Sequence, residues 1–208
     1  MIGDIAEVSG TEVTLQLRQE NFLQHPDDVY AVIWAAGAGF GDPFERDPLK
    51  VYEDVVDSRS VSVAAAREIY GVVMDAAGQL DLDASARLRA GRRDARRRKD
   101  GPVKRLKGKV IARTTDSLEL RRAAGGVHFC CSRCAADLGS VRENYKDHCV
   151  KAELDISAAN PNIGDWRRYI DDRPVFRQFY CPGCGGLIEN EVAREDDEVL
   201  RDIELHVR

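Results

Sequence analysis

Two short cysteine pairs constrain the fold of this chain more than any other feature. Cys131 and Cys134 are separated by two residues, and so are Cys181 and Cys184. This spacing lets a tight turn direct both sulfurs at one ion, and two such turns complete a tetrahedral zinc site with no open position for a substrate. The sequence therefore predicts a zinc ribbon in which all four thiolates bind the metal, and in which the metal is structural rather than catalytic.

Other uses of these cysteines fit the sequence less well. A redox pair belongs in front of a helix, whereas Cys184 is followed by two glycines that favour a turn. Disulfides are not expected either, because six cysteines in 208 residues are few for a disulfide scaffold and the first ten residues show no secretory signal. We therefore expect reduced thiols and a cytoplasmic location.

Four more potential metal ligands lie near the first pair. Cys130 directly precedes Cys131 and could replace it at a spacing one residue wider, but the two-residue spacing favours Cys131. With His128, His148 and Cys149, Cys130 could also form a second metal site. Buried thiols and surface imidazoles are the preferred interpretation, since these residue types need no metal in either place. The sequence leaves both possibilities open.

The chain is long enough for one medium domain or two small ones, with 43% hydrophobic residues. Its longest apolar stretch, residues 29–40, is too short to span a bilayer and contains two glycines, so no membrane association is expected. The predicted fold class is α+β: a small β unit with short helices, then a zinc-ribbon domain with a long insert between its cysteine pairs. The expected parts are a domain over residues 1–100, a linker over 101–126 and the ribbon domain over 127–208.

Alternation, β-branched runs and capping residues predict the individual elements. The expected strands are Thr11–Leu17, Val29–Trp34, Val72–Met74 and Val175–Tyr180. The expected helices are Pro48–Val56, a second one capped by Ser62 and reaching about Ile69, and a third one from Asp83 into an arginine-rich run. Residues 103–124 have mixed character and receive no assignment.

The first half of the chain resembles a known family. The resemblance rests on the stretch Gly37-Ala38-Gly39-Phe40-Gly41-Asp42-Pro43-Phe44-Glu45-Arg46-Asp47-Pro48, followed by Ala64-Ala65-Ala66-Arg67-Glu68-Ile69-Tyr70-Gly71-Val72-Val73. These residues are similar to the C-terminal end of the large hydantoinase B or oxoprolinase-type subunit. The resemblance covers about Phe22 to Arg98, with Gly-Ala-Gly-Phe-Gly in place of the family's consecutive glycines.

The second half, from about Val127, resembles a different protein, the small gamma-type subunit of acetone carboxylase. The motifs that carry this resemblance are Cys131-Ser132-Arg133-Cys134, Asn144-Tyr145-Lys146-Asp147 and Arg177-Gln178-Phe179-Tyr180-Cys181-Pro182-Gly183-Cys184.

Both resemblances lead to one system, because acetone and acetophenone carboxylases combine hydantoinase-A-like and hydantoinase-B-like large subunits with a small accessory subunit. They imply that this chain is the zinc-binding accessory subunit of an ATP-dependent ketone carboxylase. It would supply in trans a segment that its hydantoinase-B-like partner lacks. ATP and a divalent metal are expected in the partner subunits, since no GxxxxGK[ST] loop occurs here. The alternative within these families is a subunit of an ATP-dependent hydantoinase or oxoprolinase-type amidohydrolase.

A zinc-ribbon nucleic-acid-binding protein is the alternative from another class, because residues 87–109 are strongly basic. The acidic isoelectric point of about 5.5 and the lack of aromatic residues in the basic run argue against nucleic acid as a partner.

The last alternative is that Asp42, Arg46 and Asp47 make the chain a catalyst by itself. Such residues beside glycines are more often turn caps and loop ion pairs, and no nucleophile with a base can be assembled from them. No catalytic residue is therefore expected in this chain alone. Its loop Gly37–Asp42 is the segment expected to reach a partner's active site.

Overall fold

The computed structural model describes residues 8–13, 15, 20–30, 41–160, 163 and 165–205. Residues 1–38 and 39–208 form separate compact units. The described residues of the first unit contain a turn, in which the backbone N–H of His25 donates to Asp28 Oδ2 at 2.8 Å, and no helix or strand. Most of the predicted strands Thr11–Leu17 and Val29–Trp34 lies outside the described residues, as does most of the loop Gly37–Asp42.

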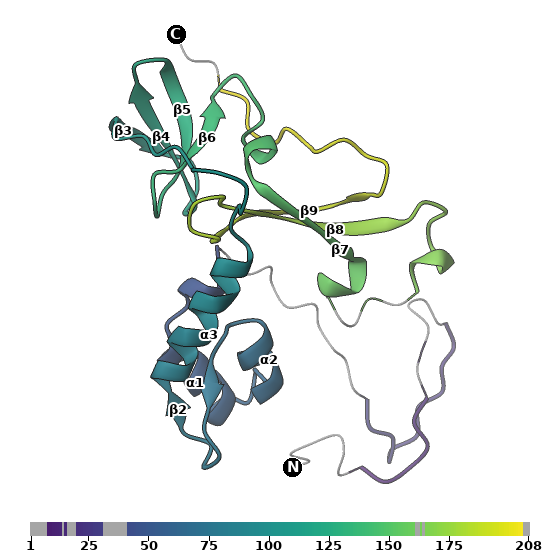
Figure 1. Cartoon of the computed structure of the whole chain (residues 1–208). Coiled ribbons are helices and arrows are strands. Elements are labelled where there is room, and N and C mark those ends of the chain that lie inside the picture. Colours follow the sequence, from purple (N-terminus) through teal and green to yellow (C-terminus); the bar gives the residue numbers. More distant parts are fainter. Residues whose placement is uncertain are drawn as a thin grey trace. The chain divides into compact units, whose positions relative to one another are not determined.

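The second unit combines short helices with small antiparallel sheets, which confirms the predicted α+β class (Figure 1). Its helices are α1 Pro48–Val56, α2 Val63–Glu68 and α3 Leu82–Ala95. Its strands are β1 Val73–Met74, β2 Leu80–Asp81, β3 Lys109–Arg113, β4 Leu118–Ala123, β5 Gly126–Cys131, β6 Asp137–Ser140, β7 Val150–Asp155, β8 Pro174–Tyr180 and β9 Leu187–Arg194. Short 3-10 turns cover Pro43–Glu45, Tyr145–His148, Ile156–Ala158 and Trp166–Arg168. In the described part of the chain no helix combines the length and apolar character that a bilayer crossing needs.

The helices begin at capping residues that the sequence largely predicts. The side chain of Asp47 accepts a hydrogen bond from the N–H of Leu49 at the start of α1, and Ser62 caps α2 in the same manner. The predicted bounds of α1 are confirmed. The third helix starts slightly earlier than expected, because Asp81 rather than Asp83 lies at the N-cap position.

The helical part has a small core and several exposed apolar side chains. Val51, Ala66 and Val72 are buried against one another beside the hairpin of β1 and β2. Five large apolar side chains of this part are exposed: Leu49, Val56, Val63, Ile69 and Leu82. Three buried side chains contribute little hydrophobic stabilisation, so this part depends on contacts with the rest of the chain or with other molecules.

The C-terminal part contains two antiparallel sheets, one of order β3-β4-β5-β6 and one of order β7-β8-β9. The predicted strand before the second cysteine pair is confirmed by β8. Strands β3 and β4 occupy the stretch that the sequence left unassigned, and β4 pairs with β5 across a two-residue turn between Ala123 and Gly126.

One hydrophobic core is shared by the two sheets. Its members include Leu118, Val127, Phe129, Leu138, Tyr145, Phe179 and Ile188, together with Cys131 and Cys181. The rings of Phe129 and Tyr145 lie 5.4 Å apart and are tilted against each other. The first cysteine of each pair is therefore part of the core that joins the sheets.

Candidate metal centre

The first cysteine pair lies in the turn between β5 and β6. Cys131 is the last residue of β5, and its N–H donates to the carbonyl of Ala136 at 3.0 Å. Ala135 has a positive φ of 57° and donates its N–H to the carbonyl of Cys131 at 2.9 Å. The turn is thereby closed by two backbone hydrogen bonds that hold both thiols on one side.

The second cysteine pair repeats this turn between β8 and β9. The N–H of Cys181 donates to the carbonyl of Gly186 at 2.8 Å, and the N–H of Gly185 donates to the carbonyl of Cys181 at 2.9 Å. Gly185 has the same left-handed conformation, with a φ of 69°. A Cβ at this position would overlap the carbonyl of Arg93 in α3, so glycine is required here. Each sheet thus contributes one turn of the same design.

The four sulfurs converge from these two turns. Cys131 Sγ lies 3.8 Å from Cys184 Sγ, and Cys134 Sγ lies 3.5 Å from Cys181 Sγ. All four atoms lie within 4.8 Å of one another. Sulfurs bound tetrahedrally at about 2.3 Å from a zinc ion stand roughly 3.8 Å apart, so this donor set fits zinc without rearrangement.

The charges of the four thiols depend on one another. Hydrogen bonds from Cys131, Cys134 and Cys181 lower the pKa of Cys184 below its ordinary value, because they stabilise its thiolate. The hydrogen bond with Cys131 lowers the pKa of Cys134 to about 7. The pKa of Cys181 is raised, chiefly by its hydrogen bonds to Cys131 and Cys134. Four thiolates at these distances require a bound cation to balance their charge.

The other candidate ligands do not join this cluster. Burial raises the pKa of Cys130 to about 11 and that of Cys149 to about 12, which keeps both thiols neutral at physiological pH. His128 Nδ1 lies 2.9 Å from Asp137, and His148 Nε2 lies 3.1 Å from Glu143. Among the described residues, only the four cysteines bring three or more potential ligands close enough to hold an ion.

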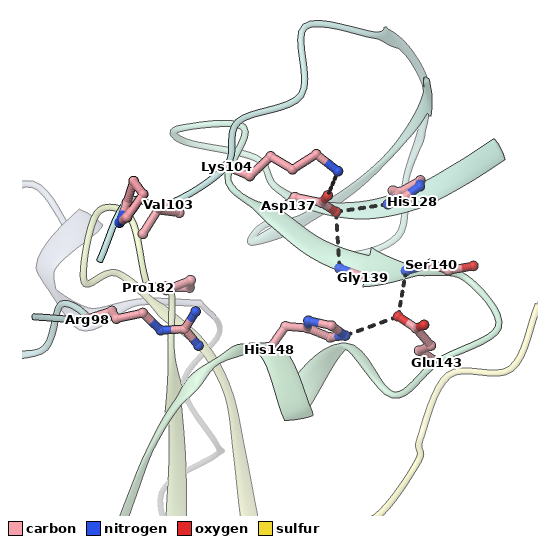
Figure 2. Close-up of a pocket in the computed structure, with 11 residues that line it drawn as sticks. Arg98, Val103, Lys104, His128, Asp137, Gly139, Ser140, Glu143, His148 and Pro182 are labelled. Atoms are coloured by element: carbon pink, nitrogen blue, oxygen red, sulfur yellow. Dashed lines mark hydrogen bonds and ion pairs between the residues drawn. The ribbon is translucent and has the colours of Figure 1, made fainter. Parts of the chain in front are cut away.

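The two histidines line a cavity of about 350 Å³ next to the second turn (Figure 2). Lys104 Nζ lies 2.8 Å from the same Asp137 that contacts His128. Burial raises the pKa of this carboxyl, but hydrogen bonds from Lys104 and His128 outweigh that effect and leave its pKa below the ordinary value. Most of the ionisable side chains that line the cavity therefore form ion pairs or hydrogen bonds with one another.

A buried carboxylate connects the helical part to both cysteine turns. The side chain of Asp42 is fully buried and accepts hydrogen bonds from the N–H groups of Phe44 and Leu187, at 3.0 and 3.1 Å. The guanidinium groups of Arg93 in α3 and Arg133 in the first turn lie 3.5 and 3.7 Å from Asp42 Oδ2. Asp42 thus acts as a structural hub between α3 and the two turns.

Replacing this hub is expected to destabilise the chain. An Asp42→Ala variant leaves two buried N–H groups without an acceptor and two arginines without their buried carboxylate, at a cost of about 3 kcal/mol. Asp42→Asn keeps one acceptor and is expected to cost less. Asp54→Ala is the control, because Asp54 pairs with Arg46 near the surface and should contribute less than about 1 kcal/mol. Urea titration followed by pulse proteolysis of the full-length chain measures all three; equal losses for Asp42→Ala and Asp54→Ala would contradict the assignment.

The other two residues considered for catalysis have evident structural partners. Asp47 caps α1, and Arg46 forms an ion pair with Asp54. The sequence signals for these contacts were the Asp-Pro dipeptide and the helical pattern behind it.

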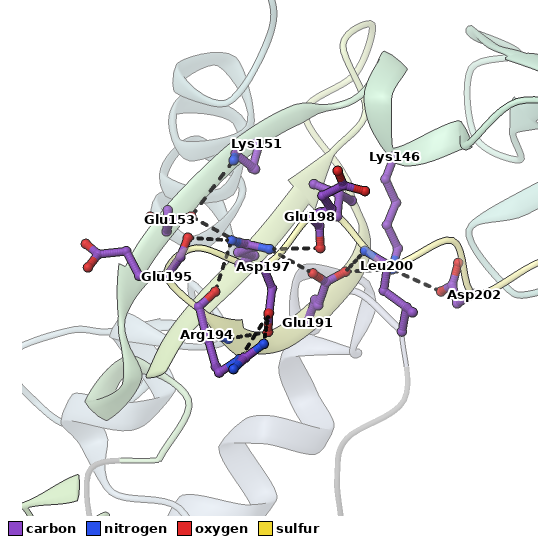
Figure 3. A network of polar contacts seen from close by, with 12 residues as sticks. Lys146, Lys151, Glu153, Glu191, Arg194, Glu195, Asp197, Glu198, Leu200 and Asp202 are labelled. Atoms are coloured by element: carbon purple, nitrogen blue, oxygen red, sulfur yellow. Dashed lines mark hydrogen bonds and ion pairs between the residues drawn. The ribbon is translucent and has the colours of Figure 1, made fainter. Parts of the chain in front are cut away.

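A network of buried ions supports the sheet that carries the second turn (Figure 3). The side chains of Arg177 and Lys146 are each 2% exposed and meet at Glu191, at 3.2 and 3.0 Å. Arg177 also contacts Glu153 at 3.0 Å and donates to the backbone carbonyls of residues 194, 195 and 198. Lys146 contacts Asp202 at 3.2 Å. The network thereby fixes residues 194–202 over one face of β7-β8-β9.

The sequence placed Lys146 and Arg177 in the motifs of the resemblance without giving them a role. A usable signal was present in β8, because Arg177 lies two residues from Val175 and two from Phe179, so all three share one face of the strand, and all three are buried. A charged residue at a buried position requires a partner of opposite charge.

Comparison with known proteins supports the resemblance to acetone and acetophenone carboxylase subunits. Residues 113–208 match the family model described as the acetone carboxylase gamma subunit. This match covers a little less than half of the chain. The matched segment includes β4, both cysteine turns and the buried ion network. It begins at residue 113, whereas the resemblance was expected to begin at about Val127.

Two curated relatives come from Aromatoleum aromaticum. The acetophenone carboxylase delta subunit is 31% identical over 106 residues, which are 50% of this chain and 15% of that protein. The acetophenone carboxylase beta subunit is 35% identical over 83 residues, which are 38% of this chain and 64% of that protein. The chain therefore spans less than two thirds of either relative. The resemblance to the small subunit of acetone and acetophenone carboxylases, drawn from the sequence, is confirmed.

Proposed function

We propose that this chain is a zinc-binding accessory subunit of a multi-subunit, ATP-dependent carboxylase that acts on a ketone of the acetone or acetophenone type. One observation carries this proposal: a single chain is similar to parts of two different subunits of the same carboxylase. A protein that combines such parts is best explained as a component of a related complex. Carbon–carbon bond formation then belongs to the complex, in the cytoplasm, and this chain alone is not catalytic.

The proposed role of zinc is structural. Cys131, Cys134, Cys181 and Cys184 would hold one ion with no position left for water or substrate, as in closed structural sites. When bound, the ion would connect the sheet of β5 to the sheet of β8, because each sheet provides one turn. The contacts of Asp42 with Arg93, Arg133 and Leu187 would then hold α3 against the two metal-bound turns.

The proposed partners are a hydantoinase-A-like and a hydantoinase-B-like large subunit. The delta subunit matches half of this chain with only 15% of its own length, which suits a segment that is separate here and part of a long chain there. The small core and the exposed apolar side chains of α1, α2 and α3 support completion of a large subunit in trans. ATP and a divalent metal would bind to the large subunits.

The arginine-rich helix does not favour the nucleic-acid alternative. Arg92 contacts Glu68, Arg93 contacts Glu45, and Arg89 donates to backbone carbonyls, including that of Tyr70. These side chains bind the protein itself and are not presented as a row of phosphate ligands.

Reconstitution of the complex tests the proposed function. The two large subunits are purified with and without this chain, and ATP-dependent incorporation of labelled bicarbonate into acetone or acetophenone is measured. We expect product only when the chain is present. Full activity of the large subunits alone, or failure of the chain to bind them, would overturn the proposal. Hydrolysis of a hydantoin or 5-oxoproline by the complex, without ketone carboxylation, would assign the amidohydrolase alternative.

A further inference from the structure

The sheet β7-β8-β9 has two faces of opposite character. Neighbouring side chains in a strand point to opposite faces, and the register places Leu154, Phe176 and Val192 in one row across the three strands. We call the face with this row the open face. Its middle consists of Ala152, Leu154, Phe176, Gln178, Asn190 and Val192.

The opposite face faces the rest of the chain. It carries the buried apolar side chains of Val175 and Phe179 together with charged residues that include Lys151, Glu153, Arg177, Glu189 and Glu191. Its central part lies beneath residues 194–202, which the buried ion network holds in place. The middle of the open face has no charged residue, although 32% of the residues of the chain are charged.

The open face carries apolar side chains at exposed positions. Antiparallel sheets with one face in water place polar residues on that face. Here Val192 is 62% exposed and Leu154 is 37% exposed, Phe176 is half-buried, and Arg177 on the other face is buried. The side chains of the open face therefore suit contact with an apolar layer.

The size and charge of the open face restrict what can cover it. Three strands about 4.8 Å apart, with roughly 3.4 Å per residue, give it an area of about 300 Å². A stable pair of proteins buries about 800 Å² on each partner, so a symmetric contact between two copies through this face alone is too small. The absence of charge excludes a strongly charged ligand surface and favours an uncharged, apolar one.

We propose that the open face docks against an uncharged apolar surface of a large carboxylase subunit, which extends beyond the sheet to other parts of this chain. This inference rests on the proposed function, because that function provides the large partner. Leu154, Phe176 and Val192 form the centre of the contact, and the amides of Gln178 and Asn190 lie beside them, 3.1 Å apart.

Co-expression of the full-length chain with its hydantoinase-B-like and hydantoinase-A-like subunits tests the docking face. Val192→Glu and, separately, Leu154→Glu place a carboxylate in the apolar row and are expected to lower the amount of chain recovered with the large subunits at least tenfold. Leu200→Glu is the matched control, since Leu200 is 61% exposed but lies beside Glu191 on the opposite face. It should assemble like the unsubstituted chain.

Two further readouts separate docking from folding. Zinc content and resistance to proteolysis of each variant chain should equal those of the unsubstituted chain, because the substituted side chains are exposed. Light scattering of the purified chain should give the same mass for all variants. Failure of the unsubstituted chain to bind the large subunits would overturn the proposed function itself.

Normal assembly of Val192→Glu and Leu154→Glu would overturn the docking face alone. Equal loss with Leu200→Glu would also overturn it, because the effect would not depend on the face. If the unsubstituted chain formed a dimer and the Val192→Glu variant were a monomer, the open face would bind a second copy of the chain. If the isolated Val192→Glu chain were less stable than the unsubstituted chain, the open face would be covered by another segment of the same chain instead of by a partner.

Discussion

A Cys131→Ser variant of the full-length chain is expected to lose its zinc and, with it, the cooperative folding of the two sheets that surround the site. Cys131 ends β5 and belongs to the shared core, and its sulfur lies 3.8 Å from that of Cys184 in the other sheet. Structural zinc sites bind with an apparent free energy of about 10 kcal/mol or more, which exceeds most of a domain's net stability. Metal analysis of the purified variant and pulse proteolysis measure the two effects.

Cys130→Ser provides the matched control for this experiment. Cys130 is also buried and directly precedes the proposed ligand, but its thiol is not among the four that converge. This variant should retain about one zinc ion per chain and lose only about 1 kcal/mol of stability, from the buried hydroxyl. Loss of zinc from Cys130→Ser but not from Cys131→Ser would assign Cys130 as the ligand. If Cys131→Ser, Cys134→Ser and Cys184→Ser all retained zinc, the proposed site itself would be wrong.

Acid is expected to weaken zinc binding in the same experiment. Zinc binds thiolates, so protons compete with the metal, and the apparent affinity falls as the pH falls. The lowered pKa values of Cys134 and Cys184 show that the arrangement of the turns already favours the charged form at two of the four positions. Chelator competition at two pH values measures this dependence; equal affinity at both would contradict thiolate ligation.

An Arg177→Met variant is expected to lose about 4 kcal/mol of stability. Methionine leaves Glu191 and Glu153 without their arginine partner, and it removes the donors that hold the backbone carbonyls of residues 194, 195 and 198. A buried charge that loses its partner costs far more than a surface ion pair contributes. Urea unfolding of the zinc-loaded chain, followed by pulse proteolysis, gives the change in the free energy of unfolding.

Arg173→Met is the control for the buried network. Arg173 pairs with Glu195 at 2.8 Å, but both side chains are about half exposed, so the loss should stay below about 1 kcal/mol. Similar losses for the two variants would mean that the network around Arg177 is not the main source of stability in this sheet.

Much of the local structure follows from short-range signals in the sequence. The cysteine spacing predicted two turns, and the four sulfurs do converge. The Asp47-Pro48 dipeptide and Ser62 located the first two helices, because capping and the φ angle of proline act within one turn. The start of the third helix was misplaced because both Asp81 and Asp83 suit an N-cap, and only the structure shows that Asp81 accepts the hydrogen bond from Ala84.

The remaining features depend on contacts that are distant in the sequence. Strands β3 and β4 were not assigned because their charged residues obscure the alternation; Gly125, in the turn between β4 and β5, was a hairpin signal that the interpretation did not use. The role of Asp42 depends on Leu187, which lies 145 residues further along the chain. The sequence does not show which face of β7-β8-β9 is exposed, because residues 194–202 cover the other face through contacts that are distant along the chain.

Purification of the tagged chain from its own host, with mass spectrometry of the co-eluting proteins and metal analysis of the same sample, tests the central claim most directly. We predict two large hydantoinase-like subunits in fixed ratio to the chain and about one zinc ion per chain. Recovery of the chain without large subunits, or together with nucleic acid, would contradict its assignment as a carboxylase subunit.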